Sequence, residues 1–89
     1  MIESEVQILN RLGLHARAAA RFVHLANTFS SRVTVLKDGT RVDGKSILGL
    51  LTLAAAKGTR LRLAIDGADE REAAERLTAL VQDRFGEDD

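Results

Sequence analysis

The chain has 89 residues, with 13 basic and 13 acidic side chains and therefore no formal net charge at neutral pH. This length is typical of one domain, spanning residues 1–89, and a neutral chain without Trp or Tyr argues against nucleic-acid binding. The absence of cysteine excludes thiol catalysis, disulfides and cysteine–zinc sites. We expect a cytoplasmic protein, because no apolar stretch could span a bilayer and the acidic N-terminus is unlike a signal peptide.

The first half of the chain predicts a strand, a helix and a hairpin. Residues 2–8 alternate between apolar and polar side chains, as in a half-buried strand. Residues 16–28 carry apolar side chains at helical spacing. Residues 32–37 predict a second strand, and the Asp-Gly pair at 38–39 is typical of a tight hairpin turn that leads into a short third strand at 40–42.

The second half predicts two further helices. Ser46 is a typical N-cap for the short apolar stretch 47–53. Asp69 and Glu72 have the spacing of a capping box, which predicts a last helix that continues to about residue 85. We expect the last four residues, which are polar and glycine-containing, to be frayed.

A fourth strand is predicted between these helices, and its charges suggest a neighbour in the sheet. Residues 59–66 alternate, with Arg60 and Arg62 on the outward face. Glu3 and Glu5 lie on the outward face of the first strand, and opposite charges on neighbouring strands attract by about 0.2–1 kcal/mol per pair. We therefore expect the first and last strands to lie side by side, in an α+β fold of order βαββαβα with an antiparallel sheet and helices on one face.

A pattern suited to phosphate lies in residues 13–17, between the first strand and the first helix. Gly13 permits a tight backbone approach, and the first turn of a helix offers free N–H groups and a positive dipole end. Arg17 adds a charge-assisted contact. His15 supplies an imidazole that can accept a phosphoryl group on nitrogen and release it again, which a serine or threonine ester does too slowly.

Simpler interpretations of these residues remain open. A lone histidine near a helix start is more often a surface residue or a cap than a reactive group. No glycine-rich nucleotide motif accompanies it, which argues against an autonomous kinase and favours a carrier, an adaptor or a regulatory module. Arg17, Arg21 and His24 share one helix face, where they form a basic rim.

Two motifs together resemble a known family. The run Gly-Leu-His-Ala-Arg after a first strand, and the run Gly-Lys-Ser-Ile-Leu-Gly-Leu-Leu at residues 44–51, are similar to those of HPr, the histidine phosphocarrier family of the bacterial phosphoenolpyruvate:sugar phosphotransferase system. The resemblance extends over essentially the whole chain. It implies an open-faced β-sandwich, in which three helices cover one face of a four-stranded antiparallel sheet.

The resemblance also implies site residues and partners. His15 would be phosphorylated on Nδ1 by enzyme I and would pass the group to enzyme IIA domains, and Arg17 would contact the phosphoryl group. No cofactor or metal is implied, and two histidines without further ligands do not make a metal site. We expect a monomer that binds neither nucleic acid nor membrane.

Partner docking is assigned by the resemblance to a second set of residues. A six- to seven-residue apolar helix cannot bury every face, so an exposed apolar patch is expected beside the histidine. The set comprises Ala20, Arg21, His24, Ile47, Leu48 and Leu51, whereas Leu50 and Leu53 are expected in the core.

Ser46 has two interpretations, an ordinary N-cap and a regulatory phosphorylation site. The resemblance to Gram-positive relatives adds HPr kinase/phosphorylase and a transcriptional regulator as further partners. The family usually has Pro where this chain has Ala18, and Leu12 stands where relatives often have a small or polar residue. An alternative function is therefore a regulatory HPr-like module, nitrogen-related or Ser-phosphorylated, that acts by docking alone.

Overall fold

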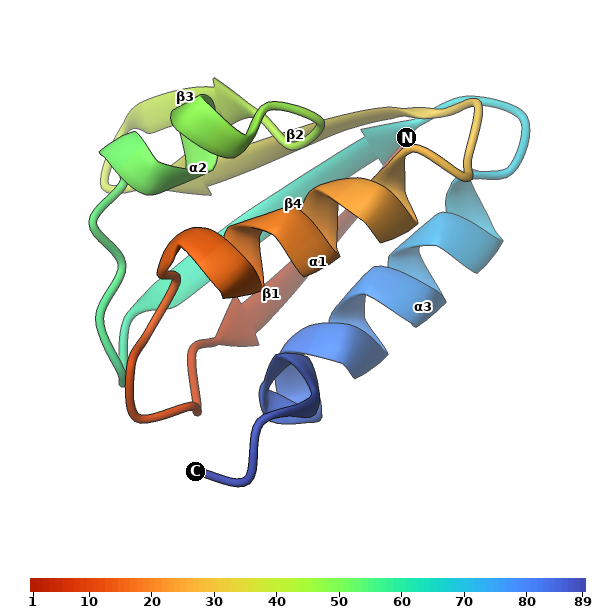
Figure 1. Ribbon diagram of the computed structural model, residues 1–89. Coiled ribbons are helices and arrows are strands. Elements are labelled where there is room, and N and C mark those ends of the chain that lie inside the picture. The colour runs from red at the N-terminus through yellow and green to blue at the C-terminus, as the bar shows by residue number, and fades with distance from the viewer.

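The computed structural model describes residues 1–89, which form four strands, three α-helices and one 3-10 turn (Figure 1). The order βαββαβα agrees with the order expected from the sequence. In chain order the elements are β1 (Ile2–Gln7), α1 (Ala16–Ala26), β2 (Arg32–Lys37), β3 (Thr40–Asp43), α2 (Ile47–Thr52), β4 (Arg60–Asp66), α3 (Glu70–Gln82) and the 3-10 turn η1 (Arg84–Gly86).

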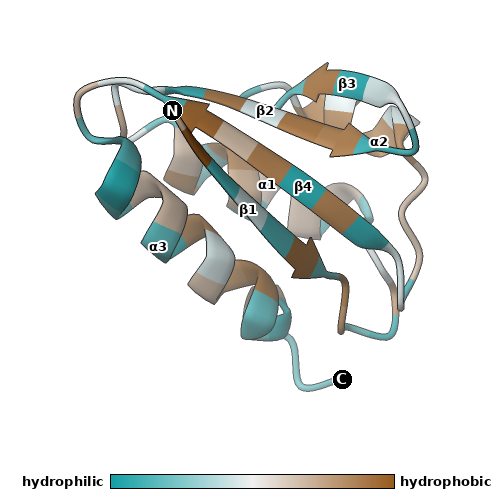
Figure 2. Ribbon diagram, turned by 180° about the vertical axis from the view of Figure 1, so that it is seen from behind, coloured by the Kyte–Doolittle hydropathy of each residue, from teal (hydrophilic) through white to brown (hydrophobic).

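The four strands form one antiparallel sheet in the order β1-β4-β2-β3. Seen from behind, the strands lie in front of α1 and α2 (Figure 2). α3 packs on β1 and β4 and also contacts α1, so the helices cover a single face of the sheet. The brown and teal bands that alternate along β4 in Figure 2 show the period of two that places one set of side chains in the core. The expected open-faced architecture is therefore confirmed.

The strand pairing expected from charge is also confirmed. β1 and β4 are direct neighbours, with Glu5 opposite Arg62 in the register. The ion pair forms on the diagonal, since Arg60 Nη1 lies 3.2 Å from Glu5 Oε1. Both side chains are exposed, so the pair contributes little to stability, and the register is set mainly by the inward-facing Val6, which lies opposite Leu61.

α1 lies on the sheet through the apolar stripe that its sequence predicts. Phe22, Val23 and the alanines of this stripe are buried, whereas Arg17 and His24 are exposed. The helix ends at Ala26, two residues earlier than expected from the sequence. Past this point the Thr28 hydroxyl donates to the Leu25 carbonyl at 2.7 Å, a local side-chain bond of the kind that competes with the helical pattern.

α2 is capped and oriented as expected. Ser46 Oγ accepts a hydrogen bond from the Gly49 N–H at 3.0 Å, and this satisfies one of the free donors at the helix start. Leu50 and Leu53 are buried, while the Leu48 side chain is 77% exposed. The short helix thus presents one apolar face to solvent.

The capping box expected at the start of α3 is wrong. Asp69 makes no side-chain bond to its own helix; its carboxylate instead accepts from the Ser30 N–H at 2.9 Å and from the Ser31 N–H at 3.0 Å. The Ser31 hydroxyl donates to the same carboxylate. Glu70, rather than Glu72, reaches back to the helix start. Three donors from a distant loop outcompete one local N–H for the Asp69 oxygens.

The expected fraying of the C-terminus is also wrong. After α3, the turn η1 directs Phe85 into the core, where it is 1% exposed. Arg84 and Phe85 both have positive φ, 57° and 54°, a conformation that non-glycine residues adopt only when tertiary contacts compensate for the strain. The last residues fold back against the loop before α1, where the Arg11 N–H donates to the Asp89 carbonyl.

Asp69 should make the fold sensitive to acid. Its hydrogen bonds with Ser31 and Ser30 lower its pKa from the ordinary value of 3.8 to about 2. A folded-state pKa below the unfolded value contributes stability that is complete above about pH 4 and is lost as the pH falls toward about 2. We expect Asp69→Asn to lower the melting temperature by a few degrees at neutral pH, and the difference from wild type to vanish near pH 2.

The measurement is thermal unfolding of wild type and variant followed by circular dichroism as a function of pH. Glu75→Gln is the matched control, since Glu75 is exposed in the same helix and makes no side-chain hydrogen bond or ion pair. A difference between wild type and Asp69→Asn that stays constant from neutral pH to about pH 2 would contradict the assignment.

Candidate functional site

His15 is the N-cap of α1, and its ring is bonded on both nitrogens. The residue has the extended backbone of an N-cap, with φ −80° and ψ 179°. Nδ1 accepts a hydrogen bond from the Arg17 N–H at 3.3 Å. Nε2 lies 2.5 Å from Glu87 Oε2. The structure therefore places the imidazole at a helix start, as the sequence predicts, with the side chain itself serving as the cap.

Gly13 fixes the path of the loop that leads to this cap. It has φ +71°, and a Cβ at this position would lie 2.6 Å from the carbonyl oxygen of Ala55. The next residue, Leu14, donates its N–H to the same carbonyl at 2.8 Å. Only glycine combines the left-handed conformation with so close a backbone approach, so the tight turn expected before the histidine is present.

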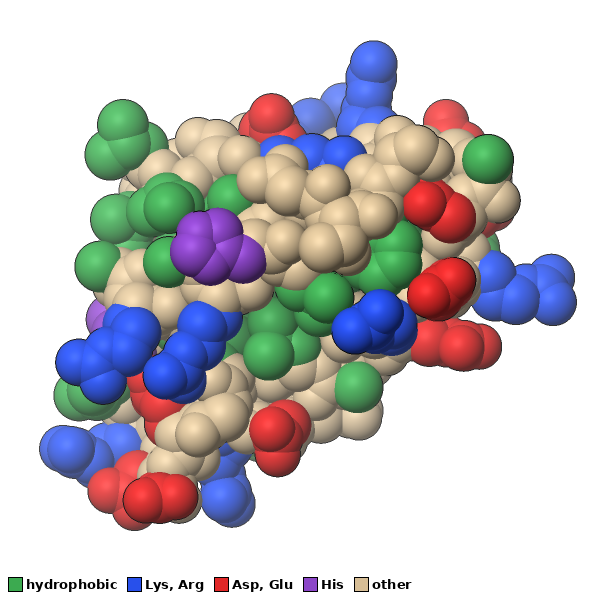
Figure 3. All heavy atoms as spheres, turned by 45° about the vertical axis from the view of Figure 1, so that its right-hand side comes forward, with side chains coloured by type: hydrophobic (Ala, Val, Ile, Leu, Met, Phe, Trp, Pro, Cys, Tyr) green, Lys and Arg blue, Asp and Glu red, His purple; other side chains and the backbone are tan.

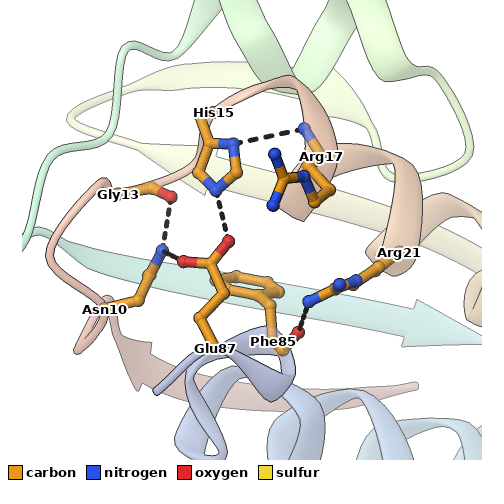
Figure 4. A network of polar contacts seen from close by, with 7 residues as sticks. All are labelled: Asn10, Gly13, His15, Arg17, Arg21, Phe85 and Glu87. Atoms are coloured by element: carbon orange, nitrogen blue, oxygen red, sulfur yellow. Dashed lines mark hydrogen bonds and ion pairs between the residues drawn. The ribbon is translucent and has the colours of Figure 1, made fainter. Parts of the chain in front are cut away.

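A carboxylate from the C-terminus completes the site (Figure 4). Asn10 Nδ2 donates to Glu87 Oε1 at 2.8 Å and to the Gly13 carbonyl at 2.8 Å. The Asn10 amide and, after it, His15 lower the pKa of Glu87 below its ordinary value, against an opposing effect of burial. Glu87 is consequently a carboxylate at neutral pH and holds its charge beside the imidazole.

The two acceptors around Asn10 settle the orientation of its amide. A carbonyl and a carboxylate both face Nδ2, so the reverse orientation would place oxygen against oxygen. The remaining atom, Oδ1, is buried without a hydrogen-bond partner. An unpaired buried acceptor costs free energy, which the two bonds made by Nδ2 offset.

The arginines near the ring differ in their partners. Arg21 Nη1 donates to the carbonyl oxygen of Phe85 and so ties α1 to the C-terminal turn. The guanidinium of Arg17 makes no hydrogen bond or ion pair with another side chain; in Figure 4 it lies beside the His15 ring. Arg17 is thus the cation that remains available for an anion at His15.

An open hollow of about 330 Å³ lies next to this cation. Basic residues and the carboxylates of the tail share its wall, so its charge is mixed rather than uniformly positive. The lining residues are Arg11, Leu12, Arg17, Arg21, Gly86, Glu87, Asp88 and Asp89.

The structure brings the expected docking residues to one surface beside the histidine. Ile47 and Leu48 are exposed, and α2, which carries them, contacts α1. Figure 3 shows hydrophobic, histidine and basic side chains close together on one part of a face. Ala20 and Leu51 are half-buried, whereas Arg21 and His24 are exposed. We name this set of six residues the docking patch.

Sequence reasoning missed two site contacts, those of Glu87 and Asn10. They lie 72 and 5 positions from His15, and no local pattern joins either of them to it. One signal was present: Phe85 is a large apolar residue just before a glycine, which suggests that the tail returns to the core instead of fraying. No group of three His, Cys, Asp or Glu side chains is placed to hold a metal ion, and none of the helices has the length and apolar character needed to cross a membrane.

Comparison with known proteins gives a consistent result. A family model described as "PTS HPr component phosphorylation site" matches residues 2–83. The chain is 53% identical over 87 residues to the phosphocarrier protein HPr of Neisseria meningitidis, covering 98% of each. It is also 47% identical over 83 residues to the HPr-like protein Crh of Bacillus subtilis, covering 93% of this chain and 98% of that protein.

Solved structures agree with the sequence comparison. The crystal structure of HPr-C-His from Thermoanaerobacter tengcongensis superposes with a TM-score of 0.95 at 43% identity, covering 99% of both chains. A second structure from that organism is described as an HPr dimer and has a TM-score of 0.78 at 44% identity, covering 98% of this chain and all of that one.

Proposed function

The chain belongs to the HPr family, the phosphocarriers of the phosphotransferase system, and on this premise we propose that its His15 accepts a phosphoryl group from phospho-enzyme I and passes it to enzyme IIA domains. The observation that carries the proposal is the geometry of His15. Its Nδ1 lies at the start of α1 within reach of the Arg17 N–H. Residues 1–89 act as one domain, and all groups of the site come from one chain, so a monomer suffices.

The chemistry follows from the two sides of the ring. Nδ1 faces the positive end of the helix, where N–H groups and Arg17 receive the phosphoryl oxygens. Each helix-end interaction contributes about 0.3–1 kcal/mol at an exposed site. Such modest stabilisation suits a carrier, because a tightly held phosphoryl group would not be released to the next protein.

The docking patch supports the proposal because it adjoins the reactive nitrogen. A partner that covers Leu48 and Ile47 also approaches the start of α1, since α1 and α2 are in contact. The exposed Arg21 and His24 give this surface a basic rim, which favours partners with acidic surfaces.

The departures from the family pattern are compatible with the same chemistry. Ala18 is fully buried within the first turn of α1, so the helix starts here without the pre-set φ of proline. The Leu12 side chain is 57% exposed and lies at the rim of the hollow beside Arg17. Neither residue displaces His15 from its N-cap position.

A second candidate function is a regulatory module that acts by docking through Ser46. The observation that favours it is the identity with the HPr-like protein Crh, whose solved structure is described as a catabolite repression protein. Ser46 is half-buried at the start of α2, where a phosphate of about −1.5 to −2 charges suits the helix and repels an acidic partner. His15 and Arg17 together favour the carrier, because a pure regulator has no need of them.

The first prediction from this proposal concerns the residue that accepts the phosphoryl group. Incubation with enzyme I and labelled phosphoenolpyruvate should give acid-labile, alkali-stable label on the wild type and none on His15→Ala, because no other side chain combines a nucleophilic nitrogen with this helix start. His24→Ala should still accept label at saturating enzyme I, since His24 belongs to the rim. No label on the wild type with enzyme I from several bacteria would reject the carrier function.

The second prediction concerns the docking patch. Leu48→Glu should raise the KM of enzyme I for this protein about tenfold. The melting temperature should stay nearly unchanged, because the Leu48 side chain is 77% exposed. Leu9→Glu is the matched control, since Leu9 is an exposed leucine outside the patch. Unfolding of Leu48→Glu, or equal effects of the two substitutions on KM, would exclude this surface.

The third prediction concerns Ser46. With HPr kinase/phosphorylase and ATP, the wild type should be labelled and Ser46→Ala should not. The variant should also lose about 1 kcal/mol of stability, because its cap bond to Gly49 is removed. Ser30→Ala serves as the control, as Ser30 is an exposed serine whose hydroxyl makes no hydrogen bond. Label that persists in Ser46→Ala would assign phosphorylation to another hydroxyl.

A further inference from the structure

The C-terminal tail, residues 86–89, contacts the His15 imidazole through the carboxylate of Glu87. Glu87 follows the buried Phe85 by only two residues, and its Oε2 lies 2.5 Å from His15 Nε2. The side chains of Glu87 and His15 are 14% and 24% exposed. The contact is therefore shielded from water. The ion pairs between arginine and acidic side chains elsewhere in the molecule are not, because their side chains are mostly exposed.

The tail is anchored on both sides of the contact. Phe85 is 1% exposed, and its carbonyl accepts a hydrogen bond from Arg21. Asn10 holds the second carboxylate oxygen of Glu87 at 2.8 Å. Since a buried ring, a guanidinium and an amide fix this short segment, the carboxylate has a defined position beside the ring and is not an occasional contact of a loose terminus.

The two bonds to the ring select one tautomer. The Arg17 N–H can donate to Nδ1 only if that nitrogen carries a lone pair. The proton of the neutral ring must then lie on Nε2, where it is donated to Glu87 Oε2. A carboxylate has no proton to donate to Nε2, so it opposes the other tautomer. The two contacts thus agree on a single state, in which Nδ1 is the nucleophilic nitrogen.

We propose that Glu87 is a positioning residue, which holds the His15 ring in the Nε2–H tautomer and so keeps Nδ1 unprotonated, with a lone pair that attacks the incoming phosphoryl group once the Arg17 N–H releases it. This inference rests on the proposed carrier function and assigns a role to a part of the tail that the resemblance did not implicate. It parallels the carboxylate that orients a catalytic histidine in hydrolases, where the carboxylate fixes the tautomer and does not take the proton.

The transfer step balances without any proton movement. The Nδ1 lone pair of His15 leaves its hydrogen bond with the Arg17 N–H and forms the new N–P bond, while the bond between phosphorus and the donor atom breaks and its electron pair stays with the donor. The Nε2 proton remains in place, so the phosphorylated ring is an imidazolium. The Glu87 carboxylate then faces a full positive charge across 2.5 Å, and it stabilises the ring both before and after transfer.

Glutamine at position 87 tests the tautomer directly. If its oxygen keeps the bond to Asn10 Nδ2, its NH2 group faces His15 Nε2, which must then be unprotonated. The proton moves to Nδ1, the nitrogen that should attack. Glu87→Ala, by contrast, only removes the constraint. The population of the Nε2–H tautomer should therefore fall in the order wild type, Glu87→Ala, Glu87→Gln.

The experiment has two readouts on the full-length protein. Nitrogen-15 NMR of the imidazole at alkaline pH measures the tautomer populations, and initial-rate kinetics with enzyme I and labelled phosphoenolpyruvate measure transfer. We expect Glu87→Gln to lower kcat about 10- to 100-fold, the range for carboxylates that orient metal-binding histidines through the other ring nitrogen, with little change in KM. Asp83→Asn is the matched control, because it removes the same charge from an exposed residue of the C-terminal segment that makes no side-chain hydrogen bond and does not line the hollow, and it should change kcat less than twofold.

Several outcomes overturn the proposal. One is an equal tautomer ratio in wild type and both variants; another is a tautomer shift without loss of kcat. An equal loss in Asp83→Asn would assign the effect to the charge of the C-terminal segment, and a rise in KM alone would make Glu87 a docking contact. Truncation after Phe85, which preserves the anchor, should behave as Glu87→Ala and replaces either variant that fails to fold. If the wild type takes no label, the carrier function fails, and the NMR measurement still decides the role of Glu87.

Discussion

Burial of one face of the sheet under α1 is the constraint on which the other features depend. Ala18, Ala19 and Ala26 are fully buried, and α1 contacts both α2 and α3, so it is packed on the sheet between the other two helices. A helix held this way cannot rotate, because rotation would expose Phe22 and bury a charged neighbour. The start of α1 is therefore fixed in space, and with it the histidine that caps the helix.

The fixed helix also determines where the polar groups converge. The loop before α1 is pressed against the segment at Ala55, where only Gly13 fits. The C-terminal turn then closes over the same end of the molecule through Phe85 and Arg21. The imidazole consequently lies between a helix start and a carboxylate, with one polar partner on each nitrogen. An exposed histidine on a free loop would have neither.

Local patterns predicted the elements with short-range causes. The alternation in β1 and β4, the Ser46 cap and the buried stripe of α1 follow from periods of two and of about four residues, which depend only on neighbouring residues. Even one long-range feature was predictable, because the outward charges of β1 and β4 are complementary and mark the two strands as neighbours. The exposed Leu48 followed from geometry as well, since so short a helix cannot bury all of its sides.

The failures have a common physical cause. Both concern acidic residues. The neighbours of Asp69 in the sequence suggest a helix cap, and those of Glu87 suggest a solvated tail. In the fold each accepts hydrogen bonds from a segment far away in the chain, from Ser30 and Ser31 in one case and from Asn10 and His15 in the other. A carboxylate accepts hydrogen bonds from whichever donors the folded chain brings to it, and no local pattern encodes that choice.

The sequence by itself determined the strands, the helices, the antiparallel α+β architecture and the position of His15 at a helix start, because these depend on residues close together in the chain. Only the tertiary structure decided that Glu87 meets His15, because 72 positions separate them and the burial of Phe85 brings them together.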